Sequence, residues 1–196
     1  MNSDMSFREG DCVRMRSSKP LIPTYVAIIE EMKADSRDVR VRWYYWPEET
    51  KKGRRHFHGS KELILSDHFD VQSVDTIEGK CTVHSLKKYM KLDVVGDDDF
   101  FCRFNYNSAT GALTPDIVQV YCKCEMPYNP DEVMVQCDHC TDWFHPACID
   151  MTVEEAERID NFSCESCSLE VQKKLRGSHS ATRLPDTNVD TKRRQR

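Results

Sequence analysis

The sequence lacks any apolar run that approaches the roughly 18 residues of a membrane-spanning helix, and it shows no secretory signal peptide. It also lacks the nucleophile, base and orienting group of a covalent catalyst, because no recognisable base accompanies Cys12, Cys81 or Cys102. We therefore expect a protein with no membrane partner and no catalytic residues.

An overall excess of positive charge is absent too, since the 196 residues carry a net charge of −5. Positive charge is concentrated in residues 169–196, where eight basic and three acidic residues give +5, which leaves −10 for the rest of the chain. An acidic body is a poor general DNA binder but suits a basic peptide. Beyond Leu175 the chain is polar without apolar periodicity, so we predict that the basic tail 169–196 is disordered.

Cysteine, by contrast, is plentiful, and most of it falls into closely spaced pairs. Seven of the ten cysteines and one histidine form the runs C-K-C, C-D-H-C, H-P-A-C and C-E-S-C, separated by twelve, four and fifteen residues. These spacings supply two complete tetrahedral ligand sets, so we predict two structural Zn²⁺ ions. The predicted ligands are Cys122, Cys124, Cys137, Cys140, His145, Cys148, Cys164 and Cys167.

Alternatives to this zinc region are weaker. Unpaired buried cysteines would not explain four pairs that all have ligand spacing. His139 lies inside a C-x-x-C pair that is already complete, which favours an exposed loop residue. With every position on both metals filled by protein, metal-assisted hydrolysis is disfavoured. The three remaining cysteines scatter among strand-like segments, which favours a reducing compartment, cytosol or nucleus.

Residues 7–121 read as a β-rich domain, with short alternating runs broken by Gly, Pro, Asn and Asp. One alternating run puts Trp43 and Tyr45 on one face of a strand and Tyr44 on the other. The pattern alone favours packing of these aromatic residues in a core. No linker separates this domain from Cys122, so we expect the two regions to be held close.

The ligand order, four cysteines, one histidine and three cysteines, with Trp143 two residues before His145, resembles a PHD finger. A RING resembles it less well, because its histidine normally comes earlier. The resemblance implies interleaved zinc sites, one formed by Cys122, Cys124, His145 and Cys148 and the other by Cys137, Cys140, Cys164 and Cys167.

The resemblance to PHD fingers that bind trimethylated lysine at the start of histone H3 also implies an aromatic cage. A quaternary ammonium has no N–H to donate, so it is held by cation–π attraction of about 0.5–2 kcal/mol per ring. The matching positions are Tyr128, Met134 and Trp143, with Tyr121 as a further wall. Packing against the zinc core is the alternative role for Trp143.

Acidic residues beside this cage are candidate peptide contacts. A peptide that adds as an antiparallel strand along V-M-V-Q would bring an arginine to Asp138, with Asp131 and Glu132 on the acidic rim. A solvated surface is an almost equally favoured reading of these three carboxylates.

The β-rich domain resembles the BAH domain through E-G-D-C-V, P-T-Y-V-A, V-R-W-Y-Y-W-P-E-E and K-E-L-I-L-S-D-H-F-D. The joined arrangement over residues 7–168 resembles plant BAH–PHD chromatin readers of the Short Life and Early Bolting in Short Days type. In that family the BAH domain reads trimethylated lysine 27 of histone H3 through a cage, and the matching positions are Tyr25, Trp43 and Tyr45. Asp67 and His68 are candidate peptide contacts, although a Ser-Asp-His turn can simply cap a strand.

We therefore expect a mainly β protein: a β-barrel-like BAH domain at 7–121, a zinc-stabilised PHD finger at 122–168 and the tail. The resemblance implies a nuclear, non-enzymatic reader of H3 tails trimethylated at lysines 27 and 4, acting on nucleosomes in repression of flowering genes. A RING-like ubiquitin ligase is one alternative. The other is a DNA- or nucleosome-binding architectural protein whose basic loop 51–61 contacts phosphate, although a solvated loop is favoured there.

Overall fold

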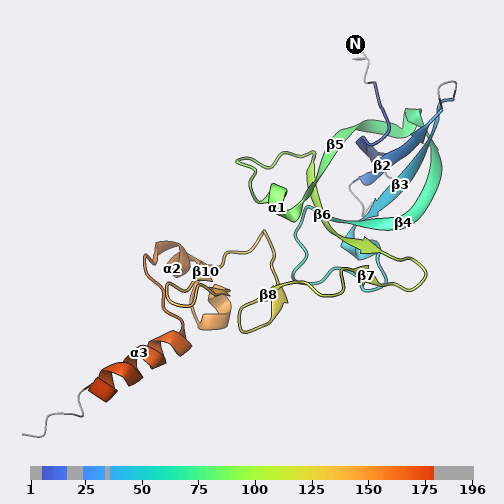
Figure 1. The fold of residues 1–196 in the computed structure, drawn as a ribbon. Coiled ribbons are helices and arrows are strands. Elements are labelled where there is room, and N and C mark those ends of the chain that lie inside the picture. The colour runs from blue at the N-terminus through green and yellow to red at the C-terminus, as the bar shows by residue number, and fades with distance from the viewer. Residues whose placement is uncertain (1–5, 17–23, 34–35, 179–196) are drawn as a thin grey trace, which may run out of the picture. The chain divides into compact units, whose positions relative to one another are not determined.

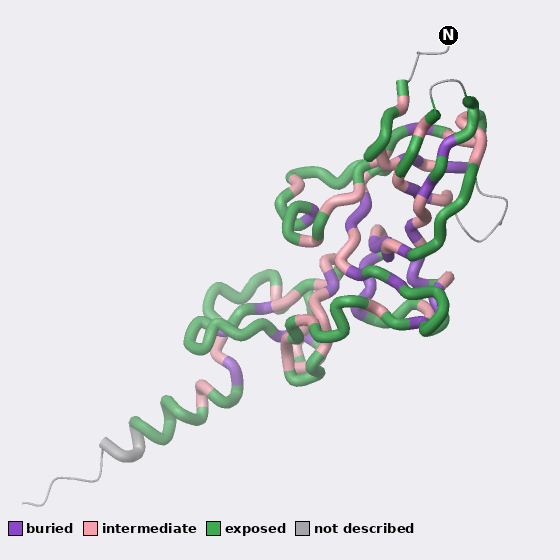
Figure 2. The backbone as a smooth tube through the Cα atoms, turned by 45° about the vertical axis from the view of Figure 1, so that its right-hand side comes forward, coloured by how far each residue is buried: buried purple, intermediate pink, exposed green. Residues whose placement is uncertain are grey.

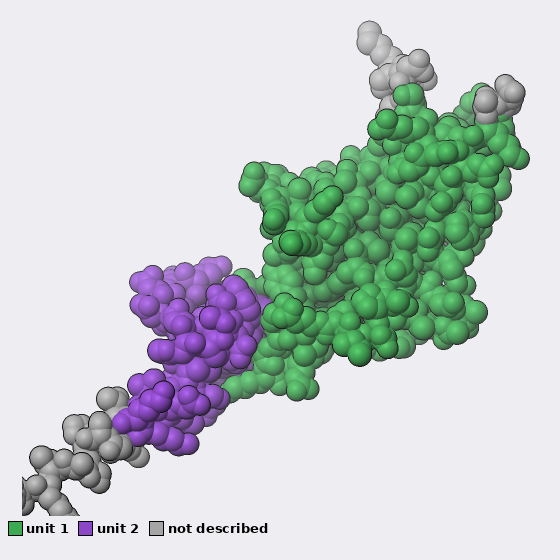
Figure 3. Space-filling model, in the orientation of Figure 1, with its two compact units in different colours: residues 1–133 green, residues 134–196 purple. Residues whose placement is uncertain are grey.

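The structure is a computed structural model that describes residues 6–16, 24–33 and 36–178. The chain forms two compact units, Met1–Val133 and Met134–Arg196, which Figure 3 colours separately. The division falls inside the zinc region, because residues 122–133 belong to the same unit as the β-rich domain. We describe each unit by itself.

The first unit is built from strands with short helical turns between them (Figure 1). Its longer elements are β1 (Cys12–Met15), β2 (Tyr25–Met32), β3 (Asp38–Tyr45), β4 (Glu62–Ser73), β5 (Ile77–Ser85), α1 (Leu86–Tyr89) and β6 (Asp99–Tyr106). Its short elements are η1 (Pro47–Glu49), η2 (Val74–Thr76), β7 (Leu113–Thr114), β8 (Val120–Tyr121) and β9 (Met126–Pro127).

The main sheet closes on itself. Its strand order is β4-β3-β2-β1-β5-β6-β7, and a further parallel pairing joins β4 to β6 through residues 62–66 and 101–106. Because this pairing connects β4, at one end of the order, to β6, the strands β1 to β6 form a closed barrel, and β7 adds to β6 outside the closure. The barrel confirms the fold class that the sequence predicts.

Alternation along the strands supplies two packed clusters. Val39 and Val41 of β3 are completely buried in one cluster, with Val13 and Met15 of β1. Tyr44 points to the other face of β3 and is buried in a second cluster. Trp43 lies at the rim of the first cluster and is only half-buried. Figure 2 shows this burial concentrated in the barrel strands.

An irregular ladder lies beside Trp43. The antiparallel register of β3 and β4 shifts between Arg42, which faces Phe69, and Tyr44, which faces Leu65. At this point β4 has more residues than the facing part of β3, as in a β-bulge. Such irregularities often change the direction of side chains next to functional sites. The predicted face of Trp43 and Tyr45 therefore lies where the regular pairing is interrupted.

The second unit contains two short strands, a 3₁₀ turn and two helices: β10 (Val135–Gln136), β11 (Trp143–Phe144), η3 (Pro146–Ile149), α2 (Val153–Arg158) and α3 (Glu165–Ser178). Helix α2 begins with a capping box, in which Glu155 N–H donates to the Thr152 hydroxyl and the Thr152 N–H donates to the Glu155 carboxylate. Residues 169–178, which are predicted to belong to the disordered tail, lie in α3. The rest of the predicted tail lies outside the described residues.

Among the described helices, none is both long and apolar enough to cross a membrane.

His58 is a buried histidine in the segment that precedes β4. His58 is 5% exposed, its Nδ1 accepts a hydrogen bond from Arg55 N–H at 2.9 Å, and its ring packs on Phe57. Among the described residues its Nε2 has no hydrogen-bond partner. Burial, assisted by the Arg103 guanidinium, lowers the pKa of His58 to about 4.

We predict that His58→Asn reduces the acid sensitivity of the fold. The neutral imidazole stabilises the folded state above its unfolded pKa, and this contribution is lost as the pH falls towards the folded pKa of about 4. Between pH 7 and pH 5 the parent should lose about 2 kcal/mol more stability than the variant. Urea unfolding at both pH values measures this difference, and equal losses in the two proteins would contradict it.

Candidate functional site

Two aromatic side chains of the predicted BAH cage lie together on the barrel. Tyr25 begins β2 and Trp43 lies near the end of the adjacent strand β3. Their ring centroids are 5.8 Å apart with an interplanar angle of 66°, so one ring presents its edge to the other. Both rings are half-buried, which leaves part of each available to a ligand. An edge-to-face corner of this kind suits a cation that approaches ring faces.

Tyr45, the third predicted wall, is held by a different set of neighbours. Its hydroxyl lies 2.9 Å from Nδ1 of His68, and the two rings meet edge-on with centroids 6.0 Å apart. On another side Tyr45 packs against Tyr106 of β6 at 5.8 Å. Burial raises the pKa of Tyr45, so the phenol stays neutral. Because Trp43 and Tyr45 are two residues apart on β3, their side chains leave the strand on the same face.

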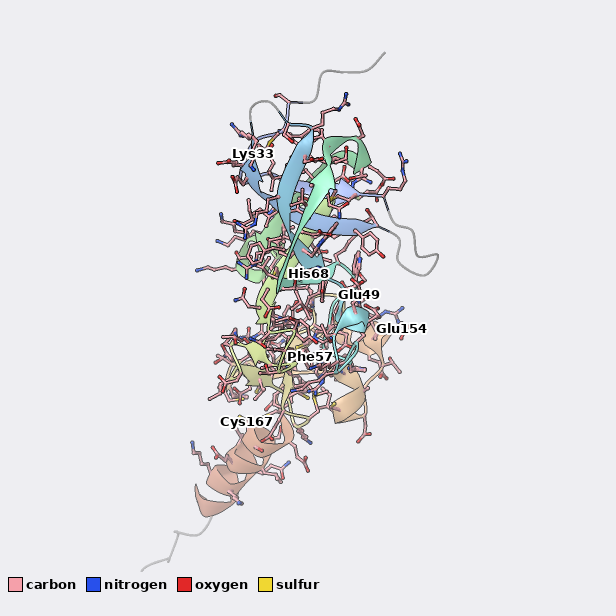
Figure 4. All side chains as sticks on the ribbon, turned by 90° about the vertical axis from the view of Figure 1, so that its right-hand side faces the viewer. Lys33, Glu49, Phe57, His68, Glu154 and Cys167 are labelled. Carbon is pink, nitrogen blue, oxygen red and sulfur yellow. The ribbon has the colours of Figure 1, made fainter. Side chains whose placement is uncertain are left out.

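The two predicted peptide contacts follow each other on β4. His68, labelled in Figure 4, is exposed and contacts the predicted cage through Tyr45. Asp67 is also exposed, and its carboxylate accepts hydrogen bonds from Ser108 N–H at 3.0 and 3.2 Å, which lower its pKa. Asp67 therefore ties β4 to the turn that follows β6, as well as placing a negative charge next to His68.

The eight predicted zinc ligands gather into two groups. Cys122, Cys124, His145 and Cys148 form one, Cys137, Cys140, Cys164 and Cys167 form the other, and within each group the donor atoms lie within 4.8 Å of one another. The sulfur atoms of Cys140 and Cys164 are 3.8 Å apart. This equals the edge of a tetrahedron with zinc–sulfur bonds of about 2.3 Å, so the residues fit zinc. These are the two interleaved groups that the PHD resemblance implies, and they are consistent with two structural zinc ions in the finger.

The aromatic residues of the zinc region divide into core and surface. Phe144 is buried and packs on Phe162 with ring centroids 5.9 Å apart. The neighbouring Trp143 is 39% exposed. Phe144, rather than Trp143, therefore fills the small core beside the metals, and Trp143 is available at the surface.

The other predicted finger cage residues are half-buried. Tyr121 ends β8, and its ring lies 6.3 Å from the ring of Tyr128 at an angle of 73°. Burial raises the pKa of Tyr128, which keeps this ring neutral. Met134 lies one residue before β10 and is half-buried as well.

The three predicted acidic contacts of the finger each have a partner within the chain. Asp138 accepts a hydrogen bond from Phe162 N–H at 2.8 Å. Asp131 accepts from Ser60 N–H at 2.5 Å, and Glu132 lies 3.3 Å from Nδ1 of His56. Asp131 and Glu132 therefore connect residues that follow the first zinc ligands to the barrel domain.

A buried ion pair strengthens this connection, and sequence reasoning missed it. Glu62 is completely buried, and its carboxylate accepts hydrogen bonds from Nε and Nη2 of Arg103 at 2.7 and 3.0 Å. The same guanidinium donates to the carbonyl oxygens of Tyr128 at 2.7 Å and Phe57 at 2.9 Å. The sequence does contain a signal for this ion pair, because each charged residue lies within a strongly apolar strand segment, K-E-L-I-L for Glu62 and F-F-C-R-F for Arg103.

Shape complementarity accompanies the ion pair. Asn129 is 6% exposed and donates from Nδ2 to the carbonyl oxygen of His56 at 3.0 Å. Gly59 is buried here, and a Cβ atom at this position would lie 3.0 Å from the Phe101 ring and 3.1 Å from Pro130. A larger residue would have to displace one of these neighbours.

The basic loop is largely engaged in internal contacts. Arg54 pairs with Glu48 at 2.5 Å, and the Lys51 and Lys61 ammonium groups donate to backbone carbonyls of Ala109 and Asp97. These contacts engage three of the basic side chains that a phosphate-binding groove would need.

The three cysteines outside the zinc region are poor nucleophiles. Burial raises the pKa of Cys81 to about 12 and that of Cys102 to about 11, and it raises the pKa of Cys12 as well. Thiols with these pKa values stay protonated at neutral pH, whereas the thiolate is the reactive form.

The chain matches two known domain families. Residues 5–116 match the BAH domain, and residues 117–174 match the UBR7-like PHD finger. Two relatives from Arabidopsis thaliana match most of this chain. The chromatin remodeling protein SHL is 60% identical over 192 residues, covering 96% of this chain and 84% of SHL. The chromatin remodeling protein EBS is 62% identical over 164 residues, covering 82% of this chain and 70% of EBS.

Among solved structures, the yeast Rsc2 BAH domain aligns with a TM-score of 0.45 at 23% sequence identity. The alignment covers 59% of this chain and 51% of that one.

We predict that Cys164→Ala binds one zinc ion per chain instead of two. The substitution removes a buried ligand of the all-cysteine group and leaves the other group complete. Native mass spectrometry counts the bound metal. Cys102→Ala is the matched control, because Cys102 belongs to neither group and should retain both ions. Two zinc ions in Cys164→Ala would contradict the assignment.

Proposed function

Because this chain belongs to the BAH–PHD family that includes SHL and EBS, we propose that it is a non-enzymatic reader of methylated histone H3 in the nucleus. The BAH domain takes trimethylated lysine 27, the PHD finger takes trimethylated lysine 4, and nucleosomes are the larger partner. The outcome is transcriptional regulation, with repression of flowering genes as the family resemblance implies. The observation that carries this proposal is the edge-to-face pair of Tyr25 and Trp43 on the barrel.

At the BAH domain, the trimethylammonium group enters the corner between Tyr25 and Trp43, with Tyr45 as the third wall. Each ring contributes about 0.5–2 kcal/mol of cation–π attraction. A preference of ten- to a hundredfold for trimethylated over unmodified lysine needs only about 1.4–2.7 kcal/mol, so two or three rings are sufficient. Asp67 and His68 contact the peptide backbone or side chains next to the lysine, a role supported for His68 by its contact with Tyr45.

At the PHD finger, the supporting observation is the exposure of Trp143 next to a core that Phe144 already fills. Tyr121, Tyr128 and Met134 complete the proposed cage. Asp138 is a weaker candidate for a peptide contact than the sequence suggested, because its carboxylate is engaged by Phe162 N–H. Asp131 and Glu132 likewise act first as contacts to the barrel domain.

We predict that each tryptophan controls one peptide. Trp43→Ala should lower affinity for an H3 peptide trimethylated at lysine 27 by at least about tenfold, through loss of a cage wall, and leave the lysine-4 peptide unaffected. Trp143→Ala should do the reverse. Calorimetric titration of the parent and both variants, with methylated and unmethylated peptides, measures this. Unchanged lysine-27 binding in Trp43→Ala would show that the BAH cage is assigned wrongly.

A second prediction concerns the contact between Tyr45 and His68. Tyr45→Phe keeps the ring and removes the hydroxyl that lies 2.9 Å from His68. A lost hydrogen bond of about 0.5–1 kcal/mol corresponds to a two- to fivefold loss of lysine-27 affinity. Because the hydroxyl acts through His68, Tyr45→Phe should cause no further loss in a His68→Ala background. Additive losses in the double variant would contradict this arrangement.

A further inference from the structure

The planar guanidinium of Arg103 donates hydrogen bonds to four acceptor atoms. Two are the carboxylate oxygens of Glu62, and the other two are the carbonyl oxygens of Tyr128 and Phe57. The side chain is 12% exposed and lies over the Phe57 and Phe104 rings, at 5.6 and 5.3 Å from their centroids. Arginine alone can supply several donors in this fixed geometry.

One of these acceptors belongs to a proposed cage wall. The Tyr128 carbonyl carbon is bonded to the Cα atom that bears the Tyr128 side chain, so fixing the carbonyl also restrains the side chain. The ring of this side chain packs on Tyr121. The next residues are held in the same way, since Asn129 bonds His56 and Asp131 bonds Ser60. The backbone at Tyr128 is therefore fixed by the barrel domain.

We propose that Arg103 is a positioning residue for methyl-lysine reading at the PHD finger. It touches no peptide, and it acts by holding the Tyr128 backbone so that the aromatic ring is placed before the ligand arrives. The inference rests on the proposed function for the choice of ligand. It makes lysine-4 affinity depend on a residue of the BAH domain, because a ring that must be ordered during binding adds an entropic cost.

Charge neutralisation and positioning can be separated at this residue. Arg103→Lys retains a positive charge for the buried Glu62 carboxylate, which avoids the large penalty of an unpaired buried charge. A lysine ammonium lacks the planar, widely spaced donors of a guanidinium, so it cannot donate hydrogen bonds to Glu62, Tyr128 and Phe57 together. The barrel should therefore stay folded while the Tyr128 segment loosens.

The experiment titrates full-length parent and Arg103→Lys with H3 peptides trimethylated at lysine 4 and at lysine 27. Lysine-4 affinity should fall about tenfold and lysine-27 affinity should stay within about twofold, since only the finger cage loses its support. Arg37→Lys is the matched control, because Arg37 forms an exposed pair with Asp75 and should change neither affinity. Asn129→Ala, which removes the bond to His56, is a second variant that should behave like Arg103→Lys.

Hydrogen exchange gives a readout that does not depend on peptide binding. The N–H groups of Asp131 and Glu132 donate to Asn129, and they should exchange faster in Arg103→Lys while β2 and β3 keep their protection. Unchanged exchange at these amides overturns the proposal, as does an equal loss of both peptide affinities or the loss of neither. If the parent fails to bind the lysine-4 peptide, the proposed function is wrong at the finger, and the exchange result still decides whether Arg103 holds this segment.

Discussion

The buried pair of Glu62 and Arg103 is the interaction on which the arrangement of the first unit depends. Glu62 has no exposed surface, and burial raises the pKa of its carboxyl group while hydrogen bonds from Arg103 oppose that effect. A buried carboxylate is tolerated only with such partners, so Arg103 must stay in place. Glu62 starts β4 and Arg103 lies in β6, the two strands whose parallel pairing closes the barrel. The same guanidinium also donates to the carbonyl oxygen of Phe57 and to that of Tyr128, which lies beyond the first zinc ligands.

The zinc region meets a different constraint. It has little apolar material to bury, and its buried residues include Cys137, Cys164 and Phe144. Metal coordination replaces the large hydrophobic core that so short a segment cannot build. Once cysteines and one histidine supply the scaffold, aromatic side chains such as Trp143 are not needed inside and can serve a surface role.

Both proposed reading sites follow from the same division of aromatic residues. On the barrel, Tyr44 and Trp46 fill the core while Trp43 and Tyr45 stay partly exposed. In the finger, Phe144 is inside and Trp143 is outside. In each case one of two adjacent aromatic residues satisfies the packing requirement, which leaves its neighbour free to meet a cation.

The sequence by itself determined two sets of candidate zinc ligands, because these depend on the spacing of cysteine and histidine along the chain. The β-rich class followed from alternation, and the grouping of ligands and cage positions followed from family resemblance. Only the tertiary structure decided the partners of Glu62, Arg103 and Asp131, since these contacts join residues that are far apart in sequence. The exposure of Trp143 was also decided by the tertiary structure. A strand pattern shows which residues share a face, but it does not show which of the two faces is covered by the rest of the chain.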